Sequence, residues 1–120
     1  MLTKLVSEEH INFMESVEDW KEAIRVAAKP LLDSNRITEK YIEAMIRGVE
    51  EFGPYVVIAP MIAMPHARPE FGSIKPGISV LKLKKPISFT SDDENLASVI
   101  IVISTKENEA HLEMISELAL

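Results

Sequence analysis

The chain has 120 residues, of which 47% are hydrophobic, so it can bury one core but is too short for two ordinary domains. No apolar stretch approaches the roughly 18 residues that a membrane span requires, which predicts a cytoplasmic protein without membrane insertion. Because the chain has no cysteine, thiolate catalysis and cysteine-based metal sites are excluded. The formal net charge of -6 argues against nucleic acid as the main ligand, since binding to phosphate backbones depends on clustered Lys and Arg.

The N-terminal part of the chain predicts a short strand followed by an amphipathic helix. Residues 10–14 alternate polar and apolar side chains, as in a strand with one buried face, and we interpret His10 as an ordinary residue of that strand. A helix start lies at residues 16–19, and apolar residues then recur at helical spacing over residues 20–31. Pro30 is expected to interrupt the last turn of this helix.

A second amphipathic helix and a strand follow. Thr38 is a suitable N-cap, and one apolar stripe runs over residues 41–52. This helix should end at Gly53 and Pro54, which combine a residue that tolerates left-handed backbone with a helix breaker. Residues 55–59 are short, β-branched and apolar, which predicts a strand buried on both faces.

The rest of the chain predicts three more strands, an irregular loop and a last helix. The short apolar run over residues 61–64 leads into residues 65–77, whose three prolines and two glycines indicate irregular backbone. Residues 78–83 and 99–103 read as strands. Thr105 can then cap the last helix.

This order of elements favours an α/β fold: a single domain with a mixed, largely buried β-sheet flanked by helices. We expect the domain to cover residues 1–120. The last helix runs into Leu120 without a capping glycine, so the domain is expected to be truncated at the C-terminus. An uncapped apolar turn of this kind would suit contact with further residues or a homodimer.

The most suggestive segment for chemistry is residues 62–70, in which prolines lie on both sides of His66, Ala67 and Arg68. The prolines stiffen the backbone, and a stiff backbone fixes where an imidazole points. Imidazole is largely unprotonated near neutral pH and can accept a phosphoryl group, whose transfer needs mainly positioning and nearby positive charge or N–H donors. Arg68 is a candidate for that stabilising charge. On residue types alone, a structural histidine in a turn is the more frequent case.

A resemblance to a known family favours a functional His66 over a structural one. Residues 53–60 and 62–70 resemble the signature of enzyme IIA domains of the mannitol, fructose and ascorbate type, which belong to the sugar phosphotransferase system. The ascorbate-like branch is the most similar. The resemblance extends to the helix that begins at Trp20, to residues 41–45, and to the pair at residues 111–112. It implies the mannitol-type enzyme IIA fold.

The resemblance also implies roles for individual residues. His66 would accept a phosphoryl group, on its tele nitrogen Nε2, from the carrier HPr and pass it to a cysteine of enzyme IIB, while enzyme IIC moves the sugar. His111 matches a second, supporting histidine, although its spacing equally suits a histidine between core and solvent. Arg47 is the nearest match to an arginine that some members place near the active histidine. Because the connection over residues 48–60 departs from the family pattern, Arg47 could equally face solvent. No cofactor or metal is implied.

Two alternatives of other classes stay open. One is a regulatory module of the same fold that reports the phosphorylation state. The other is a hydrolase with His66 as general base, for which the sequence shows no evident nucleophile or partner acid. The acidic run over residues 91–94 lacks the glycine and distal glutamate of a calcium loop, so we interpret it as a solvated turn.

Overall fold

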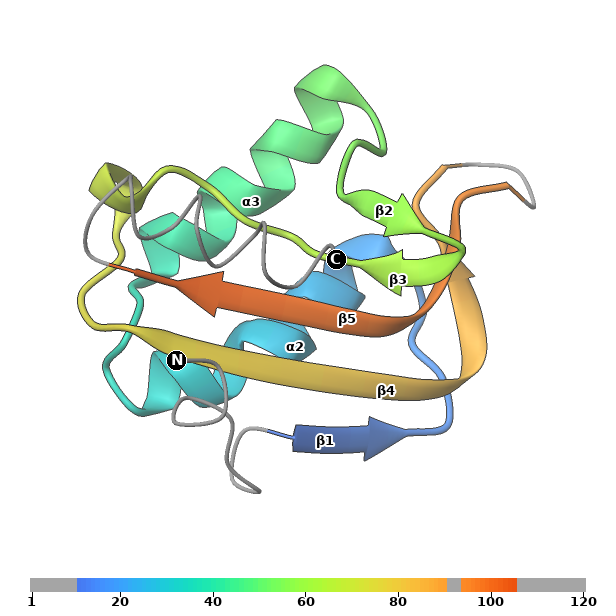
Figure 1. The fold of residues 1–120 in the computed structure, drawn as a ribbon, viewed down its shortest axis with the longest axis horizontal. Coiled ribbons are helices and arrows are strands. Elements are labelled where there is room, and N and C mark those ends of the chain that lie inside the picture. The colour runs from blue at the N-terminus through green and yellow to red at the C-terminus, as the bar shows by residue number, and fades with distance from the viewer. Residues whose placement is uncertain (1–10, 91–93, 106–120) are drawn as a thin grey trace.

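The computed structural model describes residues 11–90 and 94–105. In this part of the chain, five strands form one mixed sheet in the order β1-β4-β5-β3-β2 (Figure 1). The strands are β1 (Ile11–Met14), β2 (Val57–Ala59), β3 (Met61–Ala63), β4 (Gly77–Ser88) and β5 (Leu96–Ser104). The long strands β4 and β5 pair antiparallel in the centre, and β1 and β3 add to them in parallel. Strand β2 closes the far edge, antiparallel to β3.

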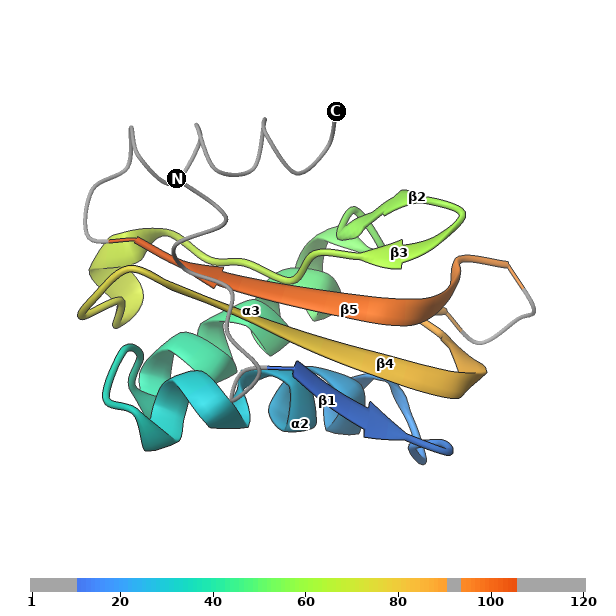
Figure 2. The same ribbon diagram turned by 60° about the horizontal axis from the view of Figure 1, so that its bottom comes forward.

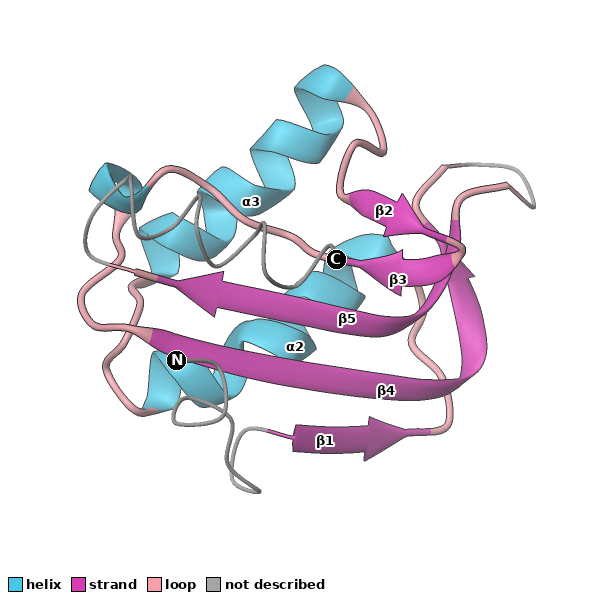
Figure 3. Ribbon diagram, in the orientation of Figure 1, coloured by secondary structure: helices cyan, strands magenta, loops and turns pink. Residues whose placement is uncertain are grey.

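Two helices, α2 (Trp20–Asp33) and α3 (Glu39–Phe52), lie together on one face of the sheet (Figures 2 and 3). Their apolar stripes meet the sheet in one core, because each helix turns one side inward and leaves the other side charged. The largest fully buried side chains of this core are Tyr41, Ile24, Leu31, Ile37, Met45, Leu81, Leu83 and Ile100. Neither helix is long and apolar enough to span a bilayer.

Helix α2 begins where the sequence predicts and continues further than predicted. The Asp19 carboxylate caps it by accepting a hydrogen bond from the Glu22 N–H at 2.8 Å. The expectation that Pro30 interrupts the last turn is wrong, since the helix runs to Asp33. Proline removes only its own N–H, and the next turn still closes on its carbonyl, which accepts from the Ser34 N–H at 3.1 Å.

Helix α3 has the predicted boundaries. Thr38 is at the N-cap with extended backbone (φ -108°, ψ 168°), but its side chain makes no capping hydrogen bond. At the other end, Gly53 has φ 84° and donates its N–H to the Val49 carbonyl at 2.9 Å. A positive φ is easy for glycine, so the predicted stop signal acts as expected.

The prediction of a strand buried on both faces over residues 55–59 is wrong. Strand β2 contains only the last three of these residues and forms the edge of the sheet, where Ile58 is 37% exposed. Tyr55 and Val56 belong to the preceding turn, in which Val56 is buried and Tyr55 is 44% exposed. An apolar run of this length is compatible with a central strand or with an edge strand that turns one residue towards the core, and the second case holds here, where Val57 packs against the core.

The other strands agree with the sequence, but β4 and β5 extend further than the predicted segments at residues 78–83 and 99–103. An irregularity in the β4–β5 pairing between Lys82 and Ile87 divides the long hairpin. His10, residues 91–93 of the turn predicted at residues 91–94, and the predicted last helix lie outside the described residues.

Candidate functional site

His66 lies in the extended segment directly after β3, and its side chain is half-buried. Because β3 is parallel to β5, the chain that leaves β3 continues alongside β5 (Figure 1). The two flanking prolines, Pro65 and Pro69, are buried, and Pro69 begins the short 3-10 helix η2 (Pro69–Phe71). The segment that carries His66 is therefore fixed at both ends against the body of the protein.

The backbone selects one tautomer of the His66 imidazole. Nδ1 lies 2.8 Å from the carbonyl oxygen of Met64. A carbonyl oxygen can only accept a hydrogen bond, so Nδ1 carries the proton. The neutral ring then has its lone pair on Nε2, which makes Nε2 the nucleophilic nitrogen.

An aromatic side chain lies against this imidazole. The ring centroids of Tyr55 and His66 are 5.7 Å apart and the ring planes are perpendicular, at 87°. This is the edge-to-face arrangement that aromatic pairs prefer. Tyr55 also approaches helix α3, where its hydroxyl lies over Gly48. Partial burial raises the pKa of the Tyr55 phenol.

The residue after His66 is held from inside the protein by Tyr41 of α3. The Tyr41 hydroxyl lies 2.8 Å from the carbonyl oxygen of Ile103 and 3.2 Å from that of Ala67, and it accepts from the Ala67 N–H at 3.4 Å. Burial raises the pKa of the Tyr41 phenol, so it stays protonated and can donate. One hydroxyl thus connects helix α3, the end of β5 and the segment of the candidate site.

Neither tyrosine is assigned to the site by sequence reasoning, which places Tyr41 in the apolar stripe and Tyr55 in a buried strand. A signal for Tyr41 exists in the sequence. A tyrosine at the start of a buried helix stripe needs a hydrogen-bond partner for its hydroxyl, and the nearest irregular backbone is the natural candidate. No comparable signal exists for Tyr55, because its contact depends on the turn that follows α3.

The two candidate arginines have different surroundings. Arg68 follows the site segment, and its Nε forms an ion pair with Glu70 Oε1 at 2.9 Å while its side chain is 70% exposed. Arg47 is exposed on α3. The structure thus gives each arginine access to solvent, and their roles towards a phosphoryl group stay predictions. His111 lies outside the described residues, so its supporting role stays a prediction as well.

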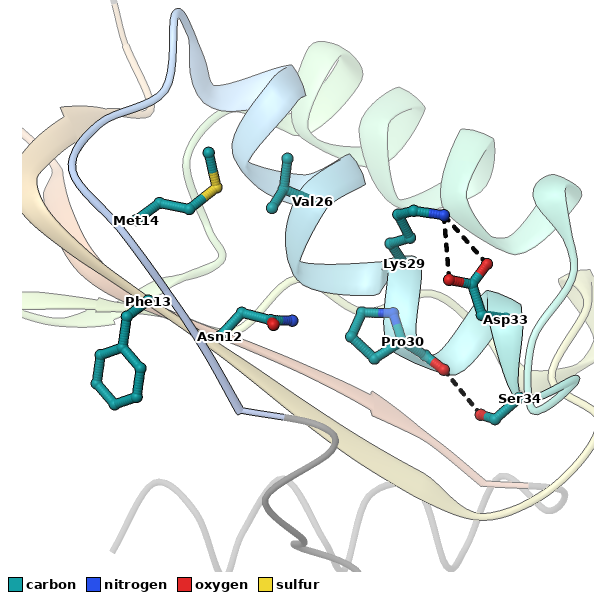
Figure 4. A pocket seen from close by; sticks show the side chains of 8 residues that line it. All are labelled: Asn12, Phe13, Met14, Val26, Lys29, Pro30, Asp33 and Ser34. Atoms are coloured by element: carbon teal, nitrogen blue, oxygen red, sulfur yellow. Dashed lines mark hydrogen bonds and ion pairs between the residues drawn. The ribbon is translucent and has the colours of Figure 1, made fainter.

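A large hollow of the described surface lies elsewhere (Figure 4). A groove of about 530 Å³ separates β1 from α2, and the Lys29–Asp33 ion pair lies at its wall. It is lined by Asn12, Phe13, Met14, Val26, Lys29, Pro30, Asp33 and Ser34. Strand β1 is the opposite edge of the sheet from β2 and β3, so this groove is separate from the histidine segment. Within residues 11–90 and 94–105, no three His, Asp or Glu side chains gather as metal ligands would.

Comparison with known proteins adds the family. Residues 4–120 match the family described as "Phosphoenolpyruvate-dependent sugar phosphotransferase system, EIIA 2". The chain is 37% identical over 110 residues to the ascorbate-specific PTS system EIIA component of Escherichia coli (strain K12). The aligned residues make up 92% of this chain and 71% of that protein.

Solved structures share the fold. The solution structure of the mannitol-specific cryptic phosphotransferase enzyme IIA of Escherichia coli has a TM-score of 0.88 at 37% identity, over 98% of this chain and 80% of that one. The mannitol enzyme IIA of Escherichia coli, solved as a complex with phosphorylated mannitol enzyme IIB, has a TM-score of 0.78 over 94% of this chain and 78% of that one. At 23% identity, this second likeness concerns the fold alone.

A family match over nearly the whole chain, on a five-stranded mixed sheet of the same fold, defines the class of protein as a component of a sugar phosphotransferase system. The chain belongs to the EIIA 2 family of that system. The resemblance to mannitol- and ascorbate-type enzyme IIA domains and the predicted α/β fold class are both confirmed.

Proposed function

We propose that this chain is a phosphoryl carrier and that His66 Nε2 is the atom that accepts the phosphoryl group. The observation that carries the proposal is the hydrogen bond from Nδ1 to the Met64 carbonyl, because it leaves the lone pair on Nε2. The proposal rests as well on membership in the EIIA 2 family and on the stiff, anchored segment around His66.

The transfer is a pair of in-line displacements at phosphorus. In the first, the Nε2 lone pair of His66 forms an N–P bond while the bond between phosphorus and the donor, phospho-HPr, breaks and its electron pair stays with the donor. In the second, a thiolate of enzyme IIB forms an S–P bond while the N–P bond breaks. The phosphoryl group moves intact, so this chain returns to its starting state and needs no cofactor.

The Met64 carbonyl helps in both directions. When Nε2 becomes bonded to phosphorus, positive charge grows on the imidazole ring, and the Nδ1–H becomes a stronger donor. The carbonyl oxygen at 2.8 Å is already in place to accept this bond, so it stabilises the charge without rearrangement. When the phosphoryl group leaves, the same bond returns the ring to its original tautomer.

The proposed partners follow from the relatives. The mannitol enzyme IIA of the same fold was solved with phosphorylated enzyme IIB, and we propose an enzyme IIB as the acceptor here. HPr is the proposed donor, and the sugar would cross the membrane through an enzyme IIC that this chain meets only indirectly. The ascorbate-specific relative suggests an ascorbate-like substrate, and the cytoplasm is the expected location.

The three histidines of the chain make a self-controlled test. Incubation with phosphoenolpyruvate, enzyme I and HPr should add one acid-labile phosphoryl group, about 80 Da by intact mass. His66→Ala should abolish the addition, His111→Ala should slow it without abolishing it, and His10→Ala should match the wild type. A wild-type chain that stays unlabelled, or a label that survives in His66→Ala, would disprove the proposal.

The nitrogen and the branch are tested separately. Two-dimensional 15N NMR of the labelled protein should show phosphorus on Nε2, and phosphorus on Nδ1 would contradict the tautomer argument. Chase of the label into purified enzyme IIB of ascorbate type and of mannitol type should favour the ascorbate type. Equal or reversed preference would overturn the substrate assignment and leave the carrier role intact.

A further inference from the structure

Helix α3 contains a glycine, Gly48, in its last two turns, between the buried Val49 and the exposed Arg47. Glycine weakens a helix interior because it adds backbone freedom to the unfolded chain, so its presence there calls for a packing reason. The reason is visible at Tyr55. A Cβ atom at position 48 would lie 2.7 Å from the Tyr55 hydroxyl oxygen, closer than real Cβ contacts come.

The same tyrosine ring reaches the candidate site. Its centroid is 5.7 Å from that of the His66 imidazole, with the planes perpendicular. Tyr55 is therefore placed between two features: the gap above Gly48 receives its hydroxyl end, and the imidazole contacts its ring. With a Cβ atom at position 48, the Tyr55 hydroxyl would have to move from its observed place.

Two contacts then control the orientation of the imidazole. The Met64 carbonyl holds Nδ1, which fixes one edge of the ring. A perpendicular aromatic neighbour restricts rotation about the bond that joins the ring to its Cβ atom, because a turned ring would collide with it or lose the contact. Together they define the direction in which the Nε2 lone pair points.

We propose that Tyr55 is a positioning residue for His66 and that Gly48 leaves the space in which the Tyr55 side chain packs against the imidazole. This inference rests on the proposed phosphoryl transfer at His66 Nε2. In-line displacement requires the attacking lone pair, phosphorus and the leaving atom to be aligned, so freedom of the imidazole lowers the rate even when the partner is bound. The ring of Tyr55 carries this role, and its hydroxyl is dispensable.

The first test uses substitutions of Tyr55 in the full chain. With saturating phospho-HPr, Tyr55→Leu should lower the single-turnover rate of labelling about tenfold, while Tyr55→Phe should stay within about twofold of wild type. The KM for HPr should change less than the rate at saturation. Phe13→Leu is the matched control, because Phe13 is an aromatic residue 74% exposed on β1, at the opposite edge of the sheet.

The second test separates positioning from stability. Alanine favours a helix more than glycine does, so Gly48→Ala should leave Tm unchanged or raise it. The new methyl group forces the Tyr55 hydroxyl, 2.7 Å from it, to move and takes the attached ring with it, so the rate of labelling should nevertheless fall several-fold. In a Tyr55→Leu background, Gly48→Ala should have no further effect on the rate, since the ring that it displaces is absent. 15N spectra should show the Nδ1–H tautomer of His66 less populated in both single variants.

The outcomes are distinct. If the wild type is not labelled on His66, the proposed function fails and Tyr55 has no reaction to serve. If the wild type is labelled but Tyr55→Leu or a folded Gly48→Ala keeps the wild-type rate, the positioning role is overturned. If Tyr55→Leu raises only the KM for HPr, Tyr55 is a docking contact, which also overturns it. Should Tyr55→Leu fail to fold, the Gly48→Ala and Tyr55→Phe pair decides alone.

Discussion

Tyr41→Phe is the substitution that tests most directly how the site segment is attached to the protein. It keeps the buried ring and removes only the hydroxyl, so packing is preserved and no large cavity forms. The contact with the Ile103 carbonyl at 2.8 Å is a well-formed hydrogen bond, whereas those with Ala67 at 3.2 and 3.4 Å are longer. A buried backbone group that loses a good hydrogen-bond partner lowers the free energy of unfolding by about 1–3 kcal/mol. Loss of one short hydrogen bond and two longer ones should therefore lower it by about 2 kcal/mol.

For a domain of this size, a loss of about 2 kcal/mol lowers Tm by roughly 8 °C. Urea unfolding should show a lower midpoint with an unchanged slope, since the surface exposed on unfolding is the same. Labelling of His66 should also slow several-fold, because Ala67 is the neighbour of His66 in the chain. Tyr55→Phe is the matched control: its hydroxyl belongs to a side chain 44% exposed, so its free energy of unfolding should change by less than about 0.5 kcal/mol. Equal stability of the two variants would refute the anchoring role of the Tyr41 hydroxyl.

Three further changes have defined outcomes. Burial raises the pKa of the Tyr41 phenol, so the unfolded chain loses this proton at a lower pH than the folded chain does. The free energy of unfolding should therefore fall as pH rises above about 10, the ordinary pKa of tyrosine. Urea midpoints of the wild type should show this loss, and those of Tyr41→Phe should show less of it. Asp19→Ala should lower the free energy of unfolding in urea by about 1 kcal/mol, because the Glu22 N–H loses its acceptor. An unchanged urea midpoint would contradict a stabilising role of this N-cap. Gly72→Ala should lower the free energy of unfolding by about 2 kcal/mol or more, because Gly72 has φ +133° and a Cβ atom there would collide with Thr38 Oγ1. If adding Thr38→Ala to Gly72→Ala restores none of this stability, the collision is not the cause.

Local signals in the sequence predict most of the described fold. The helix start at residues 16–19, the N-cap position at Thr38 and the stop at Gly53 each depend on a few neighbouring residues, and all three agree with the structure, in which Asp19 is the N-cap of α2. The error at Pro30 is local, because the helix continues past the proline to Asp33. The other error occurs where distant parts of the chain decide. Residues 55–59 read as a central strand because their apolar character was visible, whereas their place at the sheet edge depends on pairing with β3 and on packing against α3.

The same division holds for the candidate site. His66 stands out in the sequence because of its prolines and its resemblance to a family signature. Its surroundings do not, since Met64 acts through a backbone carbonyl, which any residue has, and Tyr41 acts across 62 residues of sequence through the Ile103 carbonyl. The contact of Tyr55 with His66 depends on the bend after α3 and on a glycine at position 48, and no sequence pattern predicts that combination.

The pairing of β1 has a consequence for the order of folding. Residues 11–14 pair with residues 80–83, so this parallel contact closes most of the chain, whereas β4 and β5 are neighbours in sequence and pair across a short connection. Contacts that close long loops form late, because the entropy of loop closure is lost before they contribute. We expect the β4–β5 hairpin to form early and β1 to dock last and to exchange its amide hydrogens first. Opening at that edge would remove one wall of the groove beside α2 and leave the His66 segment, on the other side of β5, in place.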